Sequence, residues 1–166
     1  MRRPIAPWVG ACLILVGVRL EADEVLAARQ TVNLIVDAIQ RISINGPATL
    51  RVTTATAGQA PTAAADTTTT YSITSNNGTV KITAHLDAAL PAGMAITLTA
   101  MAPSGGQSLG KKALSLQAVD VVNAVGKVSE TKLLSYQLTA TAAAGPLPTT
   151  TRTVILTIAA DGGDDH

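Results

Sequence analysis

The sequence predicts an all-β protein, an immunoglobulin-like antiparallel β-sandwich of about seven to nine strands. Long stretches alternate apolar and polar residues, as in 79–86, 94–101 and 151–158. A period of two puts one face of a strand in the core and the other in water. Turn-forming residues separate these stretches at short intervals, which favours a sandwich or barrel over βαβ units. Aromatic residues make up only 2% of the chain. The core must therefore consist of small aliphatic side chains, which suit two closely packed sheets.

Residues 1–22 have the pattern of a secretory signal peptide. Arg2 and Arg3 give a positive start, an apolar run follows over 8–18, and Ala22 offers a small residue for cleavage. Such a run is shorter than the roughly 20 apolar residues of a membrane-spanning helix. We therefore expect a secreted, extracellular protein at the cell surface that meets the membrane only during export. An uncleaved anchor and a buried strand are the alternatives.

Residues 23–38 form an N-terminal extension for which two structures compete. Apolar residues between Val25 and Ile42 fall at helical spacing, which favours a helix. The segment 31–36 instead alternates and is rich in β-branched residues, which favours a strand. We favour strands over 31–37 and 39–44, with a helix through residue 40 as the alternative.

Residues 39–160 are expected to form the sandwich domain. Asn76-Asn77-Gly78 predicts a tight hairpin turn, because the central residues of such turns must tolerate positive φ. Residues 118–125 are expected to form a helical turn or an irregular crossover, and 58–66 and 142–148 to be loops. Residues 161–166 contain three aspartates and are expected to be a solvated acidic tail. The remaining strands are expected over 50–56, 68–75, 79–87, 94–101, 112–116, 132–141 and 151–160.

Composition and charge disfavour several classes of function. The net charge is +1, so the chain has no surplus of basic residues with which to bind a nucleic-acid backbone. The single cysteine, Cys12, lies in the signal segment, which leaves the mature chain without a disulfide or a thiolate nucleophile. His85 is expected on the polar face of its strand with Lys81 and Thr83. Two isolated histidines do not make a metal site, and we expect neither a metal nor a cofactor.

The motifs of common enzymes are also missing from the sequence. It contains no Gly-x-Ser-x-Gly elbow, and the glycine-rich stretch 105–110 is not followed by the Gly-Lys-Ser/Thr of a phosphate-binding loop. We therefore expect that the protein is not an enzyme. Tyr71 alternates with Ile73, and Tyr136 with Leu134, so both tyrosines are expected in the core. This leaves no exposed ring on which a sugar could stack, and it disfavours a lectin.

The signal pattern, the alternating segment 31–36, the Thr- and Ala-rich strands and the closing strand 153–158 resemble bacterial secreted β-sandwich proteins. These are subunits of surface filaments and the coat-type proteins related to chaperone–usher fimbriae. The resemblance implies a subunit that assembles with copies of itself. One difference is that fimbrial subunits of this type commonly carry a disulfide.

The resemblance makes residues 23–38 a candidate donor strand, with Val32, Leu34 and Val36 on one face. A strand donated by one subunit can fill the open edge of another, where main-chain hydrogen bonds supply affinity and alternate side chains supply register. The same residues could instead be the domain's own first strand. The expected function is a structural subunit of an extracellular filament or surface layer. The alternative is a monomeric surface module for adhesion or binding.

Overall fold

The computed structural model describes residues 30–162 of the 166-residue chain. The predicted signal peptide at 1–22, the first part of the extension and residues 163–166 of the acidic tail lie outside this range. The chain divides into two units, residues 1–35 and 36–166. Of the first unit the structure describes residues 30–35, which carry no regular secondary structure.

The regular secondary structure of the second unit consists almost entirely of strands, with one short 3-10 helix at Ala142–Ala144 and no α-helix among the described residues. Seven of the strands have six residues or more, and three have two or three. The strands are β1 Gln40–Asn45, β2 Ala64–Asp66, β3 Thr70–Ser75, β4 Val80–Leu86, β5 Met94–Ala100, β6 Gln107–Ser108, β7 Lys112–Ala113, β8 Val119–Val125, β9 Val128–Ala140 and β10 Val154–Ala160.

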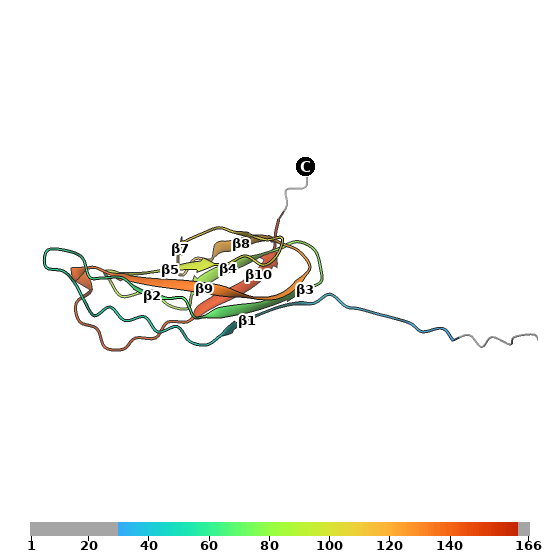
Figure 1. The fold of residues 1–166 in the computed structure, drawn as a ribbon, viewed down its shortest axis with the longest axis horizontal. Coiled ribbons are helices and arrows are strands. Elements are labelled where there is room, and N and C mark those ends of the chain that lie inside the picture. Colours follow the sequence, from blue (N-terminus) through green and yellow to red (C-terminus); the bar gives the residue numbers. More distant parts are fainter. Residues whose placement is uncertain (1–29, 163–166) are drawn as a thin grey trace, which may run out of the picture. The chain divides into compact units, whose positions relative to one another are not determined.

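The strands form two antiparallel sheets (Figure 1). The first sheet has the order β1-β3-β9-β5-β7, and β2 also pairs with β9. The 13-residue β9 makes this possible, because its first part pairs with β3 and a later part with β2, while β5 lies along its other side. The second sheet has the order β10-β4-β8-β6. The predicted all-β class with two antiparallel sheets is therefore confirmed.

One apolar core takes side chains from the inner faces of both sheets. In β4 the side chains alternate between buried and half-buried along the whole strand, as expected when one face of the strand meets the core. The predictions for the two tyrosines are confirmed, because Tyr71 and Tyr136 are both buried. The Tyr71 hydroxyl donates a hydrogen bond of 2.6 Å to the carbonyl of Met101.

The predictions for residues 31–56 are only partly correct. No strand forms over 31–37, and the alternative helix through residue 40 is also wrong for residues 30–40. The strand expected at 39–44 is present as β1. The strand expected at 50–56 is wrong, because only an isolated bridge joins Ala55 to Pro61. Proline has no N–H, so a ladder cannot extend through it.

The turn at Asn76–Gly78 has the predicted chemistry but not the predicted role. Gly78 has a φ of +55°, which suits a tight turn. However, β3 belongs to the first sheet and β4 to the second, so the turn crosses between sheets and closes no hairpin. Turn residues determine where a chain reverses direction, whereas burial of Ile73 and Ile82 in one core decides that the two strands face each other.

Three further segments differ from expectation. Residues 118–125 form β8 rather than a helical turn, and Ala64–Asp66 of the expected loop 58–66 forms β2. In β8 the register with β4 shifts twice, and Ala124 has a positive φ of 54°. A bulge of this kind interrupts the period-two pattern, which is why the sequence does not read as a strand. The strand expected at 112–116 is limited to β7, residues 112 and 113.

Candidate assembly surface

The N-terminal segment 31–37 exposes apolar side chains. The exposed fractions of Val32, Leu34 and Val36 are 65%, 87% and 82%, and that of Ile35 is 84%. In an extended chain alternate residues share a face, so the first three would form one apolar row. A row of large apolar side chains left in water is a feature of interaction sites.

Asn76 holds the chain where this segment enters β1. Its side-chain amide donates to the carbonyl of Asp37 at 2.8 Å, and its side-chain oxygen accepts from the backbone N–H of Ile39 at 2.6 Å. The backbone N–H of Asn76 also donates to the carbonyl of Ile39 at 3.1 Å. These three bonds extend the β1–β3 ladder by one pair and keep residues 37–39 in line with β1.

β10 is the first edge of the second sheet and pairs only with β4 among the described residues. The N–H of Asp87 donates to the carbonyl of Thr153, and the N–H of Asp161 donates to that of Thr79. In an antiparallel ladder the residues that bond to the partner alternate with residues whose backbone groups face away. The register therefore directs four backbone N–H and C=O pairs away from β4, those of Val154, Leu156, Ile158 and Ala160.

The inward side chains of β10 are incompletely covered. Val154, Leu156 and Ile158 pack against the core but remain half-buried, whereas Ile82 and Ala84 on the neighbouring β4 are fully buried. The difference arises because, in the described part of the chain, β4 has a strand on each side and β10 has a strand on one side only. One more strand beside β10 would cover this apolar row.

β1 is the matching edge of the first sheet, and it lies close to β10. No backbone hydrogen bond joins the two strands within residues 30–162. Ile42 of β1 packs, half-buried, against the same core. We refer to residues 40–45 and 154–160 together as the β1–β10 seam. It combines unpaired backbone groups with half-buried aliphatic side chains, which is the surface that an added strand requires.

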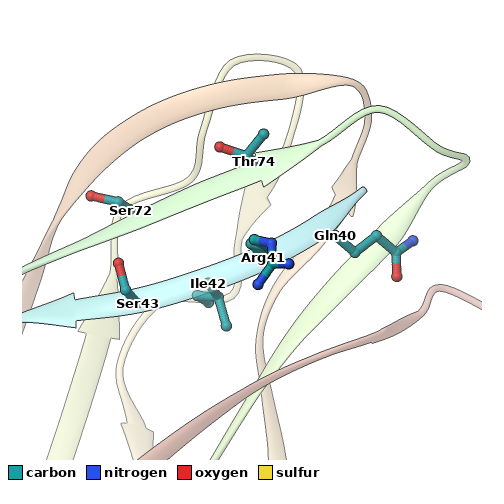
Figure 2. Close-up of a pocket in the computed structure, with 6 residues that line it drawn as sticks. All are labelled: Gln40, Arg41, Ile42, Ser43, Ser72 and Thr74. Carbon is teal, nitrogen blue, oxygen red and sulfur yellow. The ribbon is translucent and has the colours of Figure 1, made fainter. Parts of the chain in front are cut away.

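The outer face of β1 is polar. Figure 2 shows Arg41 and Ser43 of β1 beside Thr74 and Ser72 of β3, around a shallow hollow at the edge of the sheet. The register places these residues in cross-strand pairs. The hydroxyl of Ser72 bonds to that of Thr131 on β9 at 2.8 Å. The hydroxyl of Thr74 bonds to that of Ser129 on β9 at 3.3 Å. No histidine or carboxylate lines the hollow, so its lining offers no base that would activate a hydroxyl as a nucleophile.

A second opening lies at the other side of the sandwich, where the short β7 covers only part of β5. Its walls are mainly apolar, and sequence reasoning missed it because its residues come from four separate segments. They include Leu90, Met94, Ile96, Leu114 and Leu116.

Across residues 30–162 the titratable groups do not gather into a catalytic cluster. His85 lies with Lys81 and Thr83 on the outer face of β4, as predicted. Lys81 forms an ion pair of 3.1 Å with Asp120. In the described part of the chain no group of three or more His, Cys, Asp or Glu side chains is placed to hold a metal ion. Asp161, at the start of the expected tail, accepts a hydrogen bond from the N–H of Ala124.

Burial raises the pKa of Tyr71 and of Tyr136 to about 12, with smaller contributions from Glu130 and Asp66, respectively. Both phenols therefore stay protonated at neutral pH. The reverse holds for Glu130, whose pKa is lowered to about 2, first by the hydrogen bond from the Ser104 hydroxyl and then by Lys132.

Comparison of the chain with protein families, with curated proteins and with solved structures gives no match. Within residues 30–162, no helix has the length and apolar character needed to cross a membrane. The two features that point to a function are thus the apolar segment 31–37 and the β1–β10 seam.

Proposed function

We propose that the protein is a secreted structural subunit of an extracellular filament or surface layer, and that its copies join by strand complementation. The donor is segment 31–37, and the acceptor is the β1–β10 seam of another copy. The observation that carries this proposal is the exposure of Val32, Leu34 and Val36, together with a sandwich in which, among residues 30–162, no strand pairs with the outer side of β10.

The strand order of the described residues supports an immunoglobulin-like sandwich in which the position of the last strand is not taken by any strand of residues 30–162. In such folds strands A, B, E and D form one sheet, and C, F and G form the other. Here β1-β3-β9-β5 follow the order A-B-E-D, and β4 and β10 pair as C and F do. The place of strand G is beside β10, where the half-buried row of Val154, Leu156 and Ile158 lies.

The transfer free energy of the apolar row is similar in size to the cost of association. Burying three aliphatic side chains contributes roughly 5 to 9 kcal/mol of transfer free energy. This gain must offset an association cost of about 4 to 15 kcal/mol, so the new backbone hydrogen bonds of the added strand are also needed. The partner we propose is another copy of this chain, because segment 31–37 carries an exposed apolar row with the same two-residue spacing as the half-buried row of β10.

Secretion, the cell-surface location and brief membrane contact during export are proposed from the pattern of residues 1–22. The small net charge of +1 supports the absence of nucleic acid among the partners. We assign no catalytic role, metal or cofactor to the protein.

Negative-stain electron microscopy of the full chain tests the proposal. We expect filaments or large assemblies from the unaltered protein and their loss when Val32, Leu34 and Val36 are all changed to serine. The matched control is Ile35→Ser, which removes an equally exposed aliphatic residue from the other face of the segment and should leave assembly intact. Single monodisperse particles from the unaltered chain would contradict the proposal and favour a monomeric binding module.

A further inference from the structure

We infer that segment 31–37 is prevented from filling the seam of its own copy, so that strand donation takes place only between copies, and that the side-chain hydrogen bonds of Asn76 contribute to this. The inference rests on the proposed function, because it concerns which copy accepts the donor strand. Four features of the chain support it: the bonds made by Asn76, the face on which the apolar row would lie, the residues available for a turn and the directions of the strands.

The first feature is the set of bonds made by Asn76. Segment 31–37 ends only two residues before β1, so it could reach its own seam only by reversing direction between residues 37 and 40. The bonds from Asn76 to Asp37 and Ile39 hold these residues in line with β1. A reversal would have to break both side-chain hydrogen bonds.

The second feature is the face on which the apolar row would lie if the segment folded back along its own β1. A two-residue turn at Ala38–Ile39 would pair residue 37 with residue 40, and therefore Val36 with Arg41 and Leu34 with Ser43. Residues opposite each other in a ladder share a face. Arg41 and Ser43 lie on the outer polar face (Figure 2), so the apolar row would be placed in water. A shift of one residue moves every side chain of a strand to the opposite face. If the segment folded back on its own copy in this register, its polar face would therefore meet the core.

The third feature is the turn itself. A two-residue hairpin turn requires positive φ either at both central residues or at the first, which is usually glycine. The central residues here would be Ala38 and the β-branched Ile39, and neither favours positive φ. A three-residue turn would restore the correct face, but it requires a residue in the left-handed region, usually glycine. Residues 38–40 are Ala, Ile and Gln. Neither turn therefore suits the sequence.

The fourth feature is strand direction, which differs between a segment folded back on its own copy and a segment donated by another copy. β1 begins and β10 ends at the same end of the sandwich, next to the Asn76–Gly78 turn. A segment folded back along its own β1 would therefore run parallel to β10. A segment from another copy can approach from either end and form the antiparallel ladder, which is slightly more stable per residue.

Disulfide trapping in the full chain tests the inference. Cys12, the only native cysteine, is changed to serine, and Leu34→Cys is combined in turn with Val154→Cys, Leu156→Cys or Ile158→Cys. These three positions lie two residues apart on the inward side of β10 and cover the possible registers. After mild oxidation, a ladder of covalent multimers on a non-reducing gel reports donation between copies. A monomer that migrates faster than its reduced form reports closure within one copy.

We expect the ladder. Mixing a chain that carries only Leu34→Cys with a chain that carries only Leu156→Cys should also give a covalent dimer of the two. A fast-migrating monomer as the main product would overturn the inference and leave strand complementation in place. No cross-link at any of the three positions would overturn the proposed function itself.

The role of Asn76 is tested by Asn76→Ala in the same background. We expect the ratio of within-copy to between-copy product to rise about tenfold, since each of the two lost side-chain hydrogen bonds contributes a factor of a few. The matched control is Asn77→Ala. Asn77 accepts hydrogen bonds through its backbone carbonyl, so this change should leave the ratio as it was. An unchanged ratio for Asn76→Ala would contradict the role of this residue in holding residues 37–39 in line with β1.

Discussion

Leu34→Ala should weaken association between copies without destabilising the isolated subunit. Leu34 is the most exposed residue of the apolar row, at 87%, so its side chain contributes almost nothing to the stability of a single subunit. In the assembled form the same side chain would be buried against the half-buried aliphatic residues of β10. The substitution therefore separates assembly from folding.

The magnitude follows from the exposed area of the side chain. Leucine has three carbon groups more than alanine, each contributing about 0.8 kcal/mol when buried. Because 87% of Leu34 is exposed before assembly, about 2 kcal/mol of the transfer free energy remains to be gained. A loss of about 2 kcal/mol corresponds to roughly a 30-fold weaker association constant.

Light scattering over a dilution series of the full chain measures the association constant, and urea unfolding under dissociating conditions measures the stability of the subunit. Ile35→Ala is the control, since Ile35 is 84% exposed but lies on the opposite face of an extended segment. We expect a change of less than about threefold for Ile35→Ala. Equal effects of the two substitutions on association, or a lower unfolding midpoint for Leu34→Ala, would refute the assignment of the buried face.

Three further predictions concern the sandwich. Ile82→Ala should lower the free energy of unfolding by about 2 to 5 kcal/mol in urea titrations, because Ile82 is fully buried and its loss leaves a cavity; a change below about 1 kcal/mol would contradict this. Tyr71→Phe should cost about 1 kcal/mol, because it removes the hydrogen bond to the Met101 carbonyl, and an unchanged unfolding midpoint would contradict it. The pKa of Glu130 is lowered from 4.5 to about 2, so the folded state favours its ionised form and the resulting stability is lost as pH falls from about 4.5 to about 2. Unfolding midpoints of the Glu130→Gln variant should accordingly fall less steeply over this pH range than those of the unaltered protein, and parallel curves would contradict the role of Ser104.

Local pattern accounts for the parts of the fold that were predicted correctly. Alternation in the sequence identified β4, β5 and β10 and placed His85 on the outer face of its strand. It also placed Tyr71 and Tyr136 in the core. These properties depend only on which side of a strand each side chain occupies, and a period of two determines that side.

The sequence identified the donor residues of the candidate assembly surface but not the acceptor edge. Val32, Leu34 and Val36 were identified as an apolar row, but the sequence predicted a strand where residues 30–39 have no regular structure. A strand exists only where its backbone groups find a partner. The acceptor was not identified at all, because nothing in residues 154–160 indicates that this strand lies at the edge of a sheet.

By itself, then, the sequence determined the all-β class, the faces of its most regular strands and the apolar row of the extension. Only the tertiary structure decided that β3 and β4 belong to different sheets, that the bulged β8 is a strand, and that β1 and β10 are open edges. The physical reason is that side-chain alternation is a property of consecutive residues. Pairing and edges instead depend on contacts between residues far apart in the chain, such as Ser75 with Gln40 and Ala160 with Val80.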